Sequence, residues 1–107
     1  MPKKAMEILT ESMVYVRMSL TKGAKCGTDI ADDIEKITSG RVMLGPATLY
    51  TVLGKFEKEK LIREVSVAGR KRTYCITPKG TEAYEAELER LLACVKNARE
   101  VSGREVL

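Results

Sequence analysis

The chain has 107 residues, of which 44% are hydrophobic, and a formal net charge of +4, so it suits one folded domain rather than a disordered segment. No run of about 18 apolar residues occurs, which excludes a membrane-spanning helix of the usual kind. The charged start of the chain lacks an apolar core followed by a cleavage site, so we expect no secretory signal and a cytoplasmic protein.

The residue types used for metal binding and acid–base catalysis are scarce. The chain has no His and three widely spaced Cys, so a Cys/His zinc site has no ligand set. We expect Cys26, Cys75 and Cys94 to be buried, reduced thiols. No Gly-rich phosphate loop or nucleophile elbow occurs. The sequence therefore predicts no metal, no cofactor and no catalytic residues, and an enzyme built on carboxylate or Lys chemistry is the least favoured alternative.

Residues 5–20 have the periodicity of an amphipathic helix. Apolar residues recur along it at spacings of three and four: Met6, Leu9, Met13, Val16 and Leu20. Further apolar residues widen this surface: Ile8, Val14, Tyr15 and Met18. Arg17 falls largely on the polar side. A helix that is apolar on more than one side packs between two layers, and the second layer is either a partner subunit or the rest of the chain's own core.

Gly23 and Gly27 interrupt the helical pattern, and a second helix is expected over residues 28–38. Thr28 or Asp29 can cap this helix by accepting a backbone hydrogen bond. Its inward positions are Ile30, Ile34 and Ile37. Acidic residues near its start suit the helix dipole but would repel phosphate, so we expect that this helix does not enter a DNA groove.

Gly45 and Pro46 begin the third predicted helix, over residues 46–60, because Pro at the first helical position loses no hydrogen bond. Its inward positions are Leu49, Val52, Leu53 and Phe56. The opposite side carries Thr48, Thr51, Lys55 and Lys58. Small hydroxyls near a helix start, followed by Lys, suit a helix that reads DNA. Taken alone, the segment fits an ordinary amphipathic surface helix equally well.

Residues 63–68 and 72–76 have the pattern of two strands joined by a basic turn. Val65 and Val67 alternate with polar residues, as in a half-buried strand. Three consecutive cations occupy the hairpin tip: Arg70, Lys71 and Arg72. Their mutual repulsion is easier to understand if they face a phosphate backbone, although a solvated basic turn is the simpler alternative.

Thr77 and Pro78 begin a final helix that is expected to run to about residue 100. Apolar residues repeat along it at spacings of four and three, as in a heptad seam: Tyr84, Leu88, Leu91, Val95 and Ala98. Leu92 widens this seam. A small domain cannot cover so long an apolar surface by itself, so we expect the helix to mediate dimerisation.

The predicted order is helix, helix, helix, strand, basic turn, strand, helix, which is the order of a winged helix-turn-helix. The expected fold class is therefore mainly α with a small β-hairpin (α+β). Residues 1–78 are expected to form the DNA-binding region and residues 79–107 the C-terminal dimerisation helix of one compact domain. Residues 41–80 hold nine of the 19 Lys and Arg but only three of the 15 Asp and Glu, which indicates a face for a polyanion.

Over most of residues 5–95 the sequence resembles the PadR-like transcriptional regulators. The resemblance is carried by GPATLY at 45–50, by Leu53 with Phe56 and Glu57, by Leu61 with Ile62, and by GRKRTYCITPKG at 69–80. It implies a winged-helix homodimer that binds a palindromic operator, usually to repress. It also implies dimerisation through the C-terminal helix, with help from the first. The length fits the short branch of the family, which has one dimerising helix.

Two departures from the family pattern bear on structure and ligand binding. Lys60 stands where Gly normally ends the recognition helix, so either Lys adopts a positive φ at a cost of about 1 kcal/mol or the helix ends differently. The chain also lacks the Trp on which some relatives stack flat aromatic ligands. The sequence identifies no small-molecule effector.

Together these patterns predict a sequence-specific double-stranded DNA-binding transcriptional regulator, a repressor that acts as a homodimer on a palindromic operator. The alternative is a winged helix that binds an acidic protein partner without reading DNA sequence. The residues expected at the DNA are Pro46, Thr48, Tyr50, Thr51, Lys55, Lys58, Arg70, Lys71 and Arg72. The residues expected at the dimer interface are Met6, Leu9, Met13, Tyr84, Leu88, Leu91, Leu92 and Val95.

Overall fold

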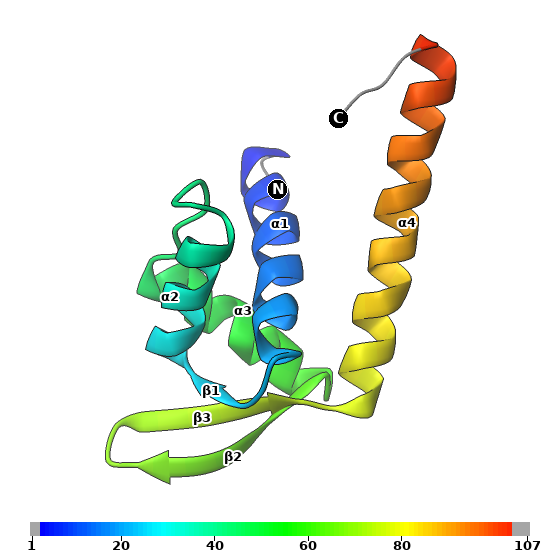
Figure 1. The fold of residues 1–107 in the computed structure, drawn as a ribbon. Helices are drawn as coiled ribbons and strands as arrows, with labels where there is room; N and C mark the ends of the chain where they lie inside the picture. The colour runs from blue at the N-terminus through cyan, green and yellow to red at the C-terminus, as the bar shows by residue number, and fades with distance from the viewer. Residues whose placement is uncertain (1–2, 104–107) are drawn as a thin grey trace.

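The computed structural model describes residues 3–103, with side chains from residue 11 onward (Figure 1). Within these residues four helices and three strands follow one another: α1 (Lys3–Leu20), β1 (Lys25–Cys26), α2 (Gly27–Ile37), α3 (Pro46–Lys58), β2 (Ile62–Ala68), β3 (Lys71–Ile76) and α4 (Pro78–Ser102). This is a winged helix-turn-helix with a long C-terminal helix, which confirms the predicted fold class.

Helices α1, α2 and α3 form the body of the molecule, and the β2–β3 hairpin projects from one side of it (Figure 1). Helix α4 runs beside α1 in the opposite direction and extends farther from the sheet (Figure 1). The molecule is accordingly elongated, with extents of 54, 29 and 27 Å. Over residues 3–103, no helix is long and apolar enough to cross a bilayer.

The sheet is antiparallel, with β3 between β1 and β2. The sequence did not predict β1, which pairs Lys25 with Tyr74 and Cys26 with Thr73. A two-residue strand is too short to show a period of two, and its partner lies almost fifty residues away, so no local pattern could indicate it. Strand β1 joins the start of α2 to the hairpin.

The expectation of a half-buried β2 is wrong. Val67 is 55% exposed and Val65 is exposed as well. The pairing register shifts between Glu64 and Ser66, so the strict alternation of the strand is broken at Val65. Beyond this point β2 lies outside the hydrophobic core, so the side chains of Val65 and Val67 remain exposed.

Helix α2 begins one residue earlier than expected and without a side-chain cap. Cys26 occupies the N-cap position, and Thr28 and Asp29 lie inside the first turn, so neither of them is the cap. Ile30 and Ile34 are fully buried as expected, whereas Ile37 is 38% exposed. Ile37 is the last residue of α2 and lies beyond the turns that pack against the body.

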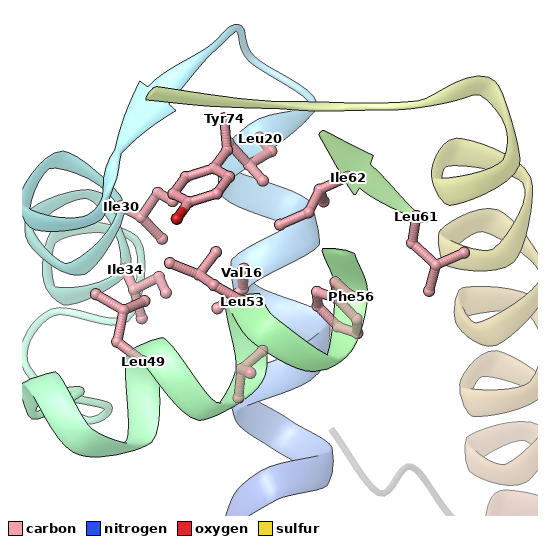
Figure 2. Packing of buried hydrophobic residues seen from close by; sticks show 11 residues of the cluster. Val16, Leu20, Ile30, Ile34, Leu49, Leu53, Phe56, Leu61, Ile62 and Tyr74 are labelled. Carbon is pink, nitrogen blue, oxygen red and sulfur yellow. The ribbon is translucent and has the colours of Figure 1, made fainter. Parts of the chain in front are cut away.

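The core lies between the three helices of the body and the sheet (Figure 2). All four inward positions predicted for α3 are buried, at 1–3% exposure. In Figure 2, Tyr74 and Ile62 point from the strands toward the α3 residues Leu53 and Phe56, while Leu61 points toward α4. The cluster consists of Val16, Leu20, Ile30, Ile34, Leu49, Val52, Leu53, Phe56, Leu61, Ile62 and Tyr74. Truncating one such side chain to Ala costs about 2–5 kcal/mol, so this cluster holds α3 in place.

Arg17 does not lie on a solvated polar side of α1, as the pattern suggested, but is 5% exposed. Helix α4 packs over that side of α1, and the Arg17 guanidinium pairs with the Glu87 carboxylate. The expected polar surface is therefore an internal contact between two helices that are far apart in the sequence.

The junctions that flank the hairpin follow the expected chemistry. Lys60 adopts a φ of 63°, the first of the two alternatives for that position. Thr77 is the N-cap of α4, and its side chain accepts a hydrogen bond from the Gly80 N–H at 3.0 Å. Gly80 lies so close to the Leu61 carbonyl that a Cβ atom there would overlap the oxygen.

The three cysteines are free thiols, but only Cys26 is buried. Cys94 is exposed on α4 and Cys75 is half-buried, so the expectation of three buried thiols is wrong for two of them. In the part of the chain that the structure describes, no cluster of three or more His, Cys, Asp or Glu side chains is arranged to hold a metal ion.

Candidate nucleic-acid interface

Helix α3 exposes a narrow stripe on the side away from the core. Thr51, Lys55 and Lys58 are all exposed. Successive residues of an α-helix are rotated by about 100°, so these three fall within one narrow sector, opposite the buried side. Thr48 lies at one edge of the stripe and is half-buried, and Pro46 is exposed at the first helical position.

Two polar groups on this stripe already have partners, one within α3 and one at its C-cap. The Thr51 hydroxyl donates to the Ala47 carbonyl oxygen at 2.8 Å, which leaves its lone pairs free to accept. The Lys55 ammonium lies 3.7 Å from a carboxylate oxygen of Glu59, and both side chains are exposed. Ion pairs of this kind contribute little, so Lys55 can leave Glu59 for another anion.

Tyr50 lies on the other flank of α3, where it meets the hairpin tip and the start of α2. Its side chain is 54% exposed. Together these three elements line a pocket of about 220 Å³, formed by Cys26, Gly27, Thr28, Tyr50, Arg70, Lys71 and Arg72. A Cβ atom on Gly27 would lie 3.0 Å from the Tyr50 hydroxyl oxygen, so a glycine allows the phenol to approach the first turn of α2.

The hairpin tip carries cations of two kinds. Arg72 is tied to the hairpin itself, because its Nε lies 3.5 Å from a Glu64 carboxylate oxygen. A hydrogen bond with the Tyr74 side chain and the nearby Glu64 carboxylate raise the pKa of Arg72, while burial raises the pKa of Tyr74. Among the described side chains, no carboxylate forms an ion pair with Arg70 or Lys71. These two cations therefore remain available to an external anion.

The structure thus groups some of the expected DNA-binding residues and separates others. Tyr50 shares a pocket with all three cations of the hairpin tip, whereas Thr51, Lys55 and Lys58 follow the exposed side of α3. The sequence interpretation did not assign Gly27 and Thr28, because the acidic residues of α2 argued against the whole helix. A Gly followed by a hydroxyl residue at a helix start is the signal that marks them. The roles of all these residues remain predictions.

The residues that were expected at the dimer interface differ in their exposure along α4. Tyr84, Leu88 and Val95 are half-buried, and burial raises the pKa of Tyr84, which the Arg17 charge opposes. Leu91 and Leu92 are exposed, at 45% and 69%. On α1, Met13 packs against the core of its own chain. The side chains of Met6 and Leu9 lie outside the described residues.

Comparison with known proteins identifies relatives of this fold and sequence. The model of the "Transcriptional regulator PadR-like family" matches residues 18–86. An uncharacterized 37.1 kDa protein in transposon TN4556 of Streptomyces fradiae is 35% identical over 77 residues, which are 72% of this chain and only 22% of that longer protein. A transcriptional regulator from Clostridium thermocellum has a TM-score of 0.78 at 22% identity, over 94% of this chain and 96% of that one. Bacillus subtilis PadR in complex with operator DNA has a TM-score of 0.63 at 21% identity, over 71% of this chain and 45% of that one.

Proposed function

Because the chain belongs to the PadR-like family of transcriptional regulators, we propose that it is a repressor that binds a palindromic operator as a homodimer. Membership of this family makes the chain a DNA-binding regulator with a winged helix-turn-helix. The family has no enzymatic activity. The proposal that the chain binds an operator is supported by Bacillus subtilis PadR, which shares the fold and whose structure was solved with operator DNA.

Helix α3 is the element that enters the major groove in this proposal. Thr48 and Thr51 face base edges near the start of the helix, while Lys55 and Lys58 approach phosphates farther along. Thr51 suits a base contact because its donated proton is satisfied within the helix and its lone pairs can accept from a base amino group. Tyr50 donates its hydroxyl to a phosphate at the flank of the helix.

The β2–β3 hairpin is the wing, and its tip holds the DNA backbone or minor groove beside the recognition helix. The observation that carries the proposal is the pocket in which Tyr50 of α3 meets Arg70, Lys71 and Arg72. A recognition helix and a wing that converge on one basic surface can contact the same stretch of duplex. A solvated basic turn that pointed away from α3 would not have this arrangement.

Helix α4 supplies the dimer contact in this proposal. Leu91 and Leu92 are exposed large apolar side chains in consecutive positions, and Val101 is 89% exposed near the end of the helix. A second copy that covers them removes apolar surface from water. Two-fold symmetry then sets two α3 helices into successive major grooves, about 34 Å apart.

The wing role is tested by fluorescence anisotropy titrations of promoter DNA at several salt concentrations. Each lost phosphate contact should lower the slope of log affinity against log salt by about one. Arg70→Ala and Lys71→Ala should each flatten the slope by this amount. Lys36→Ala is the matched control, because it removes one exposed cation from the far end of α2 and should leave the slope unchanged.

If the slope of log affinity against log salt is the same for Arg70→Ala, Lys71→Ala and the wild type, the result would contradict the wing role. A protein that binds acidic partners but no duplex with sequence preference would instead support the interaction module. Repression itself is tested in a reporter strain: expression of the protein should lower the signal from a promoter that the protein binds, and a rise in the signal would overturn the assignment as a repressor.

A further inference from the structure

Arg17 is a buried cation at the point where α1, α3 and α4 meet. Its Nε donates to the Met13 carbonyl oxygen at 3.1 Å, and its Nη2 donates to the Glu87 carboxylate of α4. The guanidinium carbon also lies 5.1 Å from the centre of the Phe56 ring of α3, within the range of a cation–π contact. One side chain therefore touches both the recognition helix and, nine residues after its start, the C-terminal helix.

These contacts are directional, unlike the apolar contacts around them. The half-buried side chains beside this contact, such as Tyr84, which lies near the Arg17 charge, are mainly apolar and impose no such direction. A guanidinium that is held on one side by a carbonyl and on the other by a ring fixes where a carboxylate can sit. Burying such a pair gains little stability over an apolar pair of similar volume, so its best-attested use is to specify geometry.

We propose that Arg17 is a positioning residue that fixes the angle between α4 and α3 through Glu87 and Phe56. This inference rests on the proposed function, because in an α4-mediated dimer that angle sets the separation of the two recognition helices. Helix α4 has 25 residues. Fifteen of them follow Glu87, a length of about 22 Å, so a change of about 10° at Glu87 displaces the far end of the helix by about 4 Å. Such a displacement corresponds to about one base-pair step of B-DNA in each subunit, or about two steps for the pair, at about 3.4 Å each.

The test is a binding selection from a duplex library in which two inverted half-sites are separated by spacers of every length over one helical turn. The key variant is Arg17→Met/Glu87→Leu, which replaces the ion pair by apolar side chains and should fold at least as stably as the wild type. Arg41→Met/Glu11→Leu is the matched control, since it removes an exposed ion pair, 3.3 Å apart, between α1 and the segment that follows α2, without involving α4.

The wild type and the control should enrich one narrow range of spacers. Arg17→Met/Glu87→Leu should retain binding to a single half-site. Its preference for that range of spacers over spacers two base pairs longer or shorter should fall roughly tenfold. Thermal melts accompany the selection, and a purely stabilising role for the pair would move the melting temperature and leave the spacer preference unchanged.

An unaltered, narrow spacer preference in the folded double variant would overturn the inference alone. If that variant does not fold, Glu87→Gln replaces it, because the amide keeps the shape and removes the charge. A broadened spacer range for Glu87→Gln supports the inference, and a wild-type range overturns it. A wild-type protein that enriches no paired half-sites would overturn the proposed function, and the inference with it.

Discussion

The backbone amide of Leu61 donates to the carbonyl oxygen of Phe56 at 2.9 Å, and this bond closes the C-terminus of α3. The Lys60 amide donates to the Glu57 carbonyl at 3.1 Å, so the two bonds together form a Schellman motif. The motif requires a left-handed residue between the helix and Leu61, and Lys60 takes that conformation with a φ of 63°. The recognition helix therefore ends at a position where a side chain is strained.

Replacing Lys60 with Gly should stabilise the protein by about 1 kcal/mol, because Gly adopts the left-handed conformation without the Cβ penalty. The control is Lys60→Ala, which removes the same charge but keeps Cβ. Chemical denaturation should therefore rank Gly above both Ala and Lys. Equal stabilities for the Gly and Ala variants would show that no strain is stored at this position.

Gly80→Ala should destabilise the protein by about 3 kcal/mol or more, because the added methyl group overlaps the Leu61 carbonyl oxygen, a backbone atom that cannot rotate away. The comparison is Gly54→Ala on α3, where a Cβ atom would meet nothing within 4 Å. That change should stabilise the protein by about 0.5–1 kcal/mol, because Gly is a poor helix former. If both variants shift the melting temperature in the same direction, the result would contradict the packing of α4 on this junction.

Sequence periodicity sufficed for the parts of the fold that depend on neighbouring residues. The four inward residues of α3 follow a helical spacing, and Thr77 with Pro78 marks the start of α4, so both were predicted. Strand β1 was not, because its two residues become a strand only through pairing with Thr73 and Tyr74. Arg17 was misjudged for a related reason: its partner, Glu87, is 70 residues away.

The candidate site was likewise predictable only in part from the sequence. Charge and the family resemblance both pointed to residues 70–72, but neither reveals that Arg72 is paired with Glu64 whereas Arg70 and Lys71 are not. The alternation of Val65 and Val67 predicted a buried face, yet the burial of a strand depends on what packs over it. The hairpin's own sequence does not indicate which of its residues other elements will cover.

Asp33 should make the stability of the fold depend on acid pH. Burial alone would raise the pKa of Asp33, but hydrogen bonds from Ser19 and Lys22 and the charges of Lys22 and Lys25 outweigh it, so the pKa lies below its ordinary value of 3.8. The unfolded chain therefore binds the proton more tightly, and the stability that Asp33 contributes is present above about pH 4 and lost as pH falls through the folded pKa.

Urea denaturation between pH 2.5 and 6 measures this dependence. Asp33→Asn should lower stability at pH 6 and reduce the loss of stability on acidification, because the amide cannot lose or gain the proton. Asp32→Asn, on the exposed side of the same helix, is the control and should keep the wild-type profile. An Asp33→Asn profile parallel to that of the wild type would contradict the assigned role.

The double substitution Leu91→Asp/Leu92→Asp should convert the proposed dimer into a monomer, because it places charges in the apolar surface that a second α4 would cover. Sedimentation velocity gives the mass directly. Met43→Asp is a matched control, since Met43 is as exposed as Leu92, at 69%, but lies between α2 and α3. A dimer that survives the double substitution would place the subunit contact elsewhere.

The central claim is that two copies of this chain read one inverted repeat through α3 and the wing. The most direct measurement is the selection of duplexes from a random pool by the wild-type protein, followed by sequencing. The expected result is an enriched inverted repeat whose half-sites are centred about one helical turn, roughly 34 Å, apart. Retention of duplexes through salt-sensitive binding without any enriched repeat would contradict the claim.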